Sequence, residues 1–167
     1  HSVYLDNAAT TPLDPQVREA MLPFLGGEDG NPSSLHQHGR RARQAVEEAR
    51  AVIASACGAC PEEVIFTSGG SEANNLAIKG VAFARYPRGR HLVASAIEHD
   101  CVLNSCRWLG DIGFSTSFLP VDESGVVRTE ELCGLLRPDT ILVSVMHANN
   151  EIGTLQPVRE IAAICRS

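Results

Sequence analysis

The chain has 167 residues, of which 44% are hydrophobic and 20% are charged, so it is long enough for one globular domain with a sizeable core. Its net charge of −6 argues against a nucleic-acid partner, because phosphate backbones favour clustered Lys and Arg. No apolar run approaches the roughly 18 residues of a membrane span, and the first residues do not read as a secretion signal. We therefore expect a cytoplasmic protein with no membrane partner, whose six cysteines are reduced and mostly buried.

The predicted elements begin with a helix that starts at Pro15, has Asp14 as its N-cap, and ends at residues 26–27 (GG). A loop then precedes a second helix over residues 35–57. From residue 63 onward, strands are predicted at 63–67, 91–95, 115–119 and 140–145, and helices at 71–85, 100–112, 129–136 and 158–165. This alternation predicts an α/β fold with a mostly parallel sheet. Because no strand follows the last helix, we expect the chain to be truncated.

The first motif that carries chemistry is residues 67–75 (TSGGSEANN), where a predicted strand gives way to a helix through two glycines. Free backbone N–H groups and the positive end of the helix dipole favour an anion at such a turn, and phosphate is the natural guest. A Ser-rich helix cap without a ligand is the alternative interpretation. The pattern matches neither a P-loop nor a dinucleotide-binding glycine motif.

Two further motifs follow predicted strands, at residues 96–100 (AIEHD) and 146–153 (MHANNEIG). A histidine at a strand end can stack on a flat ring or move a proton, and adjacent asparagines can donate to a ligand oxygen. A helix-capping histidine and a polar turn are the alternatives. Because carboxyl ends of parallel strands share one edge, we expect the three motifs to converge there.

Five segments in this order resemble the class V aminotransferases, and within them the cysteine desulfurases and the similar selenocysteine lyases. They are residues 6–12 (DNAATTP), 30–34 (GNPSS), 66–75, 98–99 (EH) and 147–153. The resemblance covers essentially the whole chain. It implies the large domain of the pyridoxal-phosphate (PLP) dependent transferases, the aspartate aminotransferase fold of type I, with a mostly parallel sheet flanked by helices. Residues 1–34 would form an N-terminal segment and pocket loop, and residues 35–167 the first, incomplete part of the PLP-binding domain.

The resemblance also implies roles for single residues. Gly70 and Ser71 would bind the cofactor phosphate, His99 would stack on the pyridine ring and assist catalytic proton transfer, and Asn150 would donate near the phenolic oxygen. The substrate pocket would be lined by Ala9, Thr10 and Asn31.

Three groups that the family's chemistry requires are not found in this chain. These are the lysine that forms the Schiff base with the cofactor, the aspartate that pairs with the ring nitrogen, and the nucleophilic cysteine. The one lysine, Lys79, lies two turns into a predicted helix at a position expected to be solvated. Cys57 and Cys60 have C-x-x-C spacing but no second pair, so no metal site is predicted.

The leading hypothesis is part of a PLP-dependent cysteine desulfurase, a transferase that converts L-cysteine to L-alanine and passes persulfide sulfur to an acceptor protein, as in iron–sulfur cluster assembly. The chain by itself is expected to be inactive. Expected partners are L-cysteine or a similar amino acid, the sulfur acceptor, and a second copy in a homodimer or a missing C-terminal half. A selenocysteine lyase, another class V enzyme, or a non-catalytic binding and assembly module are the alternatives.

Overall fold

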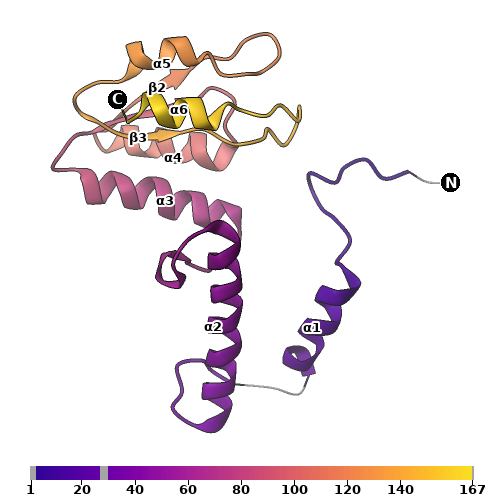
Figure 1. The fold of residues 1–167 in the computed structure, drawn as a ribbon. Coiled ribbons are helices and arrows are strands. Elements are labelled where there is room, and N and C mark those ends of the chain that lie inside the picture. Colours follow the sequence, from indigo (N-terminus) through magenta and orange to yellow (C-terminus); the bar gives the residue numbers. More distant parts are fainter. Residues whose placement is uncertain (1–2, 27–29, 167) are drawn as a thin grey trace. The chain divides into compact units, whose positions relative to one another are not determined.

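The computed structural model describes residues 3–26 and 30–166 and forms two compact units, residues 1–66 and 67–167 (Figure 1). The units divide after residue 66. The assignment of residues 35–167 to a cofactor-binding domain stays a prediction. Each unit is described below by itself.

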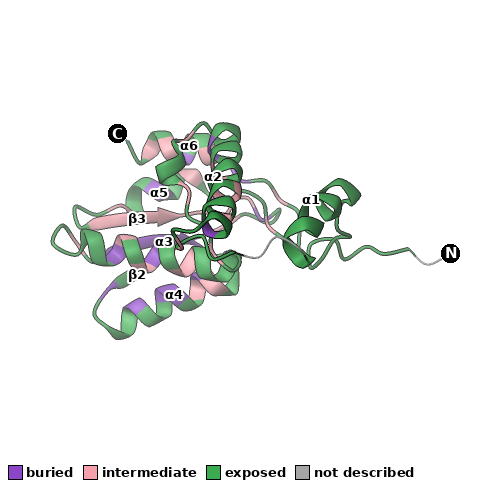
Figure 2. Ribbon diagram, turned by 90° about the horizontal axis from the view of Figure 1, so that it is seen from below, coloured by how far each residue is buried: buried purple, intermediate pink, exposed green. Residues whose placement is uncertain are grey.

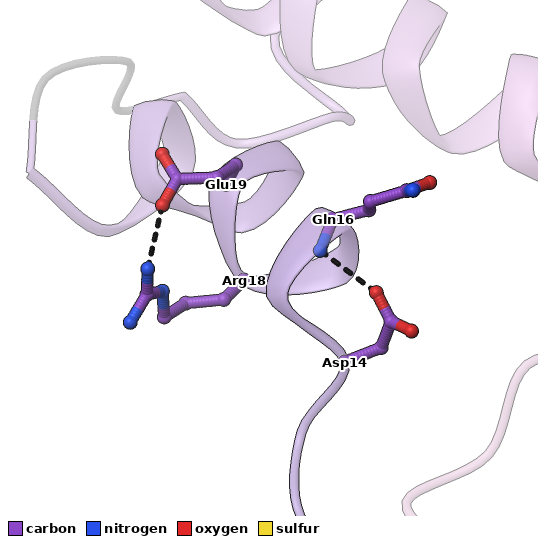
Figure 3. Close-up of polar contacts among 4 residues, drawn as sticks. All are labelled: Asp14, Gln16, Arg18 and Glu19. Atoms are coloured by element: carbon purple, nitrogen blue, oxygen red, sulfur yellow. Dashed lines mark hydrogen bonds and ion pairs between the residues drawn. The ribbon is translucent and has the colours of Figure 1, made fainter.

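The first unit begins with helix α1, Pro15–Gly26, at the predicted position. Its cap is the one expected, since the backbone N–H of Gln16 donates to Asp14 Oδ1 over 2.7 Å (Figure 3). A proline as the first helical residue fits because its missing N–H would lack a helical partner there. Gly27, half of the predicted stop signal, lies outside the described residues.

Helix α2, Gln37–Cys57, follows, and Gly58 ends it in the left-handed conformation with φ of 65°. A short 3₁₀ helix, Pro61–Glu63, comes next, so the strand predicted over residues 63–67 is wrong. The backbone at Val64 is extended, but within the described residues no strand pairs with it. Instead Arg50 of α2 donates to the Val64 carbonyl and its guanidinium lies 4.9 Å from the centre of the Phe66 ring.

The second unit contains a three-stranded parallel sheet in the order β2-β1-β3. The strands are β1 (His91–Ser95), β2 (Ser115–Leu119) and β3 (Thr140–Ser144), and the helices are α3 (Gly70–Arg85), α4 (Asp100–Asp111), α5 (Thr129–Leu135) and α6 (Val158–Ile164). The predicted α/β fold with a parallel sheet flanked by helices is confirmed. Each predicted helix and strand from residue 71 onward is present within one residue at either end.

Two apolar clusters hold the second unit together, one on each face of the sheet. Alternate residues of β1 point to opposite faces, so Leu92 and Ala94 join the cluster with α3 and α4, while Val93 joins the cluster with α5 and α6. Figure 1 shows the same division of the helices between the two sides of the sheet. This burial of both faces is typical of parallel sheets. It holds the ends of β1 and β3 in place, and the loops that follow these two strands begin there.

The six cysteines are free thiols, and the prediction that they are mostly buried is wrong. Cys106 is buried in α4 and Cys101 is partly buried, whereas Cys57, Cys60, Cys133 and Cys165 are exposed. These four lie near the ends of α2, α5 and α6 or just beyond them. Within the described residues, no helix combines the length and apolarity that crossing a membrane requires.

Candidate active site

The turn before α3 is open to an anion. Gly69 is the N-cap, and the first helical hydrogen bond runs from Ala73 N to Gly69 O over 3.0 Å, so the N–H groups of residues 70–72 precede any helical partner. A Cβ atom added at Gly69 or Gly70 would meet no atom within 4 Å. The hydroxyl of Ser71 has no hydrogen-bond partner among the described residues. Three backbone donors and one hydroxyl are therefore available together at a helix N-terminus.

Glu72 fixes the shape of this turn. Its carboxylate accepts from the backbone N–H of Ser68 over 2.7 Å and from the Ser68 hydroxyl over 2.5 Å. These bonds, the hydroxyl first, hold the pKa of Glu72 below its usual value. The Glu72 side chain therefore holds Ser68 close to the start of α3, and the N–H groups of residues 70–72 remain without partners in the part of the chain that the structure describes.

His99 lies just beyond β1 and caps helix α4. Its Nδ1 atom accepts from the backbone N–H of Cys101 over 3.1 Å, so a neutral ring carries its proton on Nε2. The capping role considered as an alternative is therefore real. Because the ring is exposed, the cap leaves its face and Nε2 available for a ligand.

The loop after β3 holds the paired asparagines in different ways. Asn149 is partly buried and uses its whole amide: Oδ1 accepts from the N–H groups of Glu151 (2.8 Å) and Ile152 (3.0 Å), and Nδ2 donates to Ile97 O (3.1 Å). Asn150 is exposed, and its side chain has no hydrogen-bond partner among the described residues. Asn149 therefore builds the loop, and Asn150 is left with a free amide.

These two loops enclose a hollow of about 330 Å³ at the carboxyl edge of the sheet, between the ends of β1 and β3. It is lined by residues 97–100 and 149–152, so two of the three motifs expected to converge at this edge, those of His99 and Asn150, lie together. Helix α3 reaches the same place, because Asn74 Nδ2 lies 3.1 Å from Cys101 Sγ, which lies 3.0 Å from His99 Nδ1. The turn at Gly70 and Ser71 is one helical turn before Asn74.

The predicted pocket residues Ala9, Thr10 and Asn31 lie in the first unit. The N–H groups of Ala9 and Thr10 donate to Asp6 O over 3.1 and 3.3 Å, and Asn31 Oδ1 accepts from Ser33 N over 2.9 Å. All three are exposed in tight turns. Their convergence with the hollow stays a prediction.

Lys79 is not fully solvated, contrary to expectation. It is partly buried, and its ammonium lies 4.5 Å from the centre of the Trp108 ring, where the π face attracts it. It lies in the middle of α3 and does not line the hollow.

Sequence reasoning missed two residues at this edge, Glu98 and Asn149. Glu98 is buried, with 8% of its surface exposed, and it accepts two hydrogen bonds. An acidic residue three positions after a buried strand was the available signal, because buried carboxyl groups need partners. Among the described residues, no group of three or more His, Cys, Asp or Glu side chains is arranged to hold a metal ion.

Comparison with known proteins gives a consistent result. The profile of the class V aminotransferases matches residues 3–167. The cysteine desulfurase IscS of Dictyoglomus turgidum is 56% identical, over 98% of this chain and 42% of that protein. A cysteine desulfurase of Homo sapiens is 52% identical, over 99% of this chain and 36% of that protein.

Solved structures agree with the relatives found by sequence. A NifS-like protein superposes with a TM-score of 0.95 at 43% identity, over 98% of this chain and 45% of that one. The structure of SspA in complex with cysteine gives a TM-score of 0.93 at 42% identity, over 99% and 48% of the two chains. The chain thus spans less than half the length of the relatives named here.

Proposed function

The chain belongs to the class V aminotransferase family, and we propose that it forms the phosphate- and ring-binding part of a PLP-dependent cysteine desulfurase. One observation carries this proposal. His99 and Asn150 line one hollow, and the open N-terminus of α3 at Gly70 and Ser71 lies one helical turn before Asn74, which contacts Cys101 beside His99. The names of the relatives at more than 50% identity support the choice of reaction.

The residues present fit the cofactor. A phosphate group needs several donors and close approach of the backbone, and both are available at residues 69–72, where Gly69 and Gly70 carry no Cβ atom. The flat ring fits beside the exposed imidazole of His99, and the free amide of Asn150 lies in the same hollow to meet a ring oxygen. When bound, PLP supplies an electron sink for reactions at an amino acid's α carbon.

In this scheme each residue has a defined role. Gly70 and Ser71 orient the phosphate, and Asn150 donates to an oxygen at the ring edge. His99 stacks on the ring and moves a proton at Nε2, since Nδ1 is engaged by the Cys101 N–H. Ala9, Thr10 and Asn31 are proposed to line the substrate pocket.

L-cysteine is the proposed substrate, with L-alanine and a protein-bound persulfide as products and a sulfur-acceptor protein as partner. The similarity to a protein solved in complex with cysteine supports an amino-acid substrate. The IscS names of several relatives support a place in iron–sulfur cluster assembly. A cytoplasmic homodimer is part of the same proposal.

Lys79 does not anchor the cofactor in this proposal, because it lies against Trp108 within α3 and outside the hollow. The 167-residue chain should therefore bind PLP without a covalent bond and should not release sulfur from L-cysteine by itself. The lysine required by the family's chemistry would have to come from elsewhere.

The test is an absorbance titration of the chain with PLP, with and without borohydride. We expect a saturable, non-covalent shift. Ser71→Ala should weaken it by about tenfold or more, since hydrogen bonds to charged groups are worth about 1.5–3 kcal/mol. His99→Ala should weaken it by up to about tenfold, since a stacked aromatic pair is worth about 0.5–1.5 kcal/mol. Ser55→Ala and His38→Ala, at exposed positions of α2, are the matched controls and should leave the affinity unchanged. A covalent product at Lys79, or full affinity in Ser71→Ala, would contradict the proposal.

A further inference from the structure

We propose that Glu98 and Asn149 form a reciprocal clamp that fixes the positions of His99 and Asn150 relative to each other. The inference rests on the proposed function for the meaning of the site, and it assigns positioning roles to two residues that do not themselves hold the ligand. Each clamp residue directly precedes one of the residues that would hold the cofactor ring. Each also bonds to the backbone of the opposite loop.

The first arm of the clamp is the side chain of Glu98. Its Oε1 atom accepts from the backbone N–H of Met146 over 2.6 Å and from the Ser95 hydroxyl over 3.0 Å. The side chain is buried, so water competes poorly for these bonds. The carboxyl group therefore ties the loop after β1 to the start of the loop after β3.

The second arm runs in the opposite direction. Asn149 Nδ2 donates to the carbonyl of Ile97 over 3.1 Å, while its Oδ1 holds the N–H groups of the next turn. The side chain of the second loop thus bonds to the backbone of the first. Together the two arms cross between the loops twice.

The clamp is needed because strand pairing stops before the site. The last paired residues of β1 and β3 are Ala94 and Ser144, and the two loops continue beyond them without a ladder. The loop after β3 is also held from behind, since Ala148 pairs with Leu155 and Gln156 donates to Gly125 O over 2.8 Å. Those bonds fix its base, and the crossing bonds of the clamp fix its distance from His99.

Three substitutions at the two clamp residues separate the clamp from general stability. Glu98→Gln keeps an oxygen acceptor for the Met146 N–H, whereas Glu98→Ala removes it. Asn149→Asp keeps the acceptor for residues 151–152 but loses the donor to Ile97 O. Ile161→Val is the control. It removes one methylene from the apolar cluster with α5 and α6, at a residue that does not line the hollow.

The measurement combines PLP titration, hydrogen exchange at the Met146 amide and NMR of the His99 ring, all on the 167-residue chain. We expect Glu98→Ala and Asn149→Asp each to weaken PLP binding by about tenfold. The Met146 N–H or the Ile97 carbonyl then loses its partner, and His99 and Asn150 are no longer held at a fixed distance from each other. The double variant should bind PLP at most about threefold more weakly than either single variant, since the effects of residues that act as one unit do not add. Glu98→Gln and Ile161→Val should stay within about threefold of the parent chain.

Exchange and NMR distinguish a failed clamp from a failed function. Faster Met146 exchange in Glu98→Ala and a shift of the His99 ring signals in Asn149→Asp support the clamp, whether or not the parent chain binds PLP. A parent chain that binds no PLP would overturn the proposed function but not the clamp. Unchanged His99 signals in Asn149→Asp would overturn the clamp. So would an Ile161→Val variant that loses as much PLP affinity as Glu98→Ala.

Discussion

The helices of residues 1–66 leave almost all of their apolar side chains exposed or half-buried, whereas those of residues 67–167 contribute buried side chains to two apolar clusters. Among the described residues of the first unit, Gly39 and Ala54 are buried, and α1 has no buried residue at all. The second unit contains both apolar clusters, with Leu92, Leu109 and Leu132 at 1% exposure or less. Figure 2 shows this difference as an almost wholly green α1 against purple segments in the second unit.

The sequences of the two kinds of helix do not explain the difference. Met21 and Leu25 of α1 are four residues apart, as are Val102 and Cys106 of α4. Met21 is 42% exposed and Leu25 71%, while the two α4 residues are 3% exposed. Helical spacing therefore predicts a helix with an apolar side, but whether that side is buried depends on a partner surface. In the second unit the sheet provides that surface.

The largest effect should come from the core of the second unit. Leu109→Ala, a fully buried position in α4, should lower the free energy of unfolding by about 2–5 kcal/mol, because a cavity is left behind. Leu22→Ala, at a position of α1 that is 49% exposed, should change it by at most about 0.5 kcal/mol. Trp108, the one tryptophan, lies in α4 and reports the unfolding of this unit in denaturant titrations.

The same titration at two protein concentrations sharpens the comparison. If the apolar side of α1 is covered by a second copy, Leu22→Ala will lower stability in a concentration-dependent way. Leu22→Ala could instead lower the free energy of unfolding as much as Leu109→Ala does, at every protein concentration. That result would mean that another part of the same chain covers the apolar side of α1.

A pair of glycines gives the next largest effect. Gly58 ends α2 in the first unit and Gly125 forms a turn in the second, and both have positive φ, of 65° and 81°. Alanine at Gly125 should cost about 1–2 kcal/mol in the Trp108 transition, because a side chain strains this backbone. Its Cβ would also collide with Ile152, which lines the hollow, so PLP affinity should fall as well.

Gly58→Ala is the matched control, since a Cβ there meets open space and the strain lies in the first unit. It should lower the helix content seen by circular dichroism without moving the Trp108 midpoint. A shift of that midpoint equal to the one in Gly125→Ala would show that the two units unfold together.

Much of the second unit could be predicted because its signals are local. The strands 91–95 and 115–119 were predicted with the observed ends, in a part of the sequence where strand-like and helix-like stretches alternate. The meeting of His99 with Asn150 followed from the rule that carboxyl ends of parallel strands share an edge.

What could not be predicted depends on partners distant in the sequence. Residues 63–67 look like a strand, but Arg50 takes the carbonyl that a neighbouring strand would have used. Lys79 looks like a solvated residue, but Trp108, on the adjacent helix, attracts it. Which of two adjacent asparagines builds the loop also depends on a distant atom, the carbonyl of Ile97.

The smallest expected effect is a pH dependence confined to the second unit. The ring of His91 is fully buried in β1, with Nδ1 2.7 Å from the Thr140 hydroxyl and Nε2 2.9 Å from the Ser117 hydroxyl. Burial lowers the pKa of His91 below its ordinary value of 6.5, and the charge of Arg137 lowers it further, while Asp139 opposes both.

Because the folded-state pKa of His91 is the lower one, the unfolded chain takes up this proton first as the pH falls. Stability is therefore complete above pH 6.5 and declines as the pH drops from there toward the folded-state pKa. The lowered pKa values of Glu72 and Asp122 act only below their ordinary values of 4.5 and 3.8, so they do not contribute in this window. The denaturant concentration at the midpoint of the Trp108 transition should thus decrease as the pH is lowered from about 7.5 to about 5.5.

His91→Gln tests this assignment, because it removes the titrating group and should flatten the pH dependence even though the variant is less stable at every pH. His38→Gln, at an exposed position in the first unit, should leave the dependence as it is. If the slope survives in His91→Gln, another group in the second unit is responsible. If it disappears in His38→Gln, the first unit contributes to the Trp108 transition and the two regions do not unfold independently.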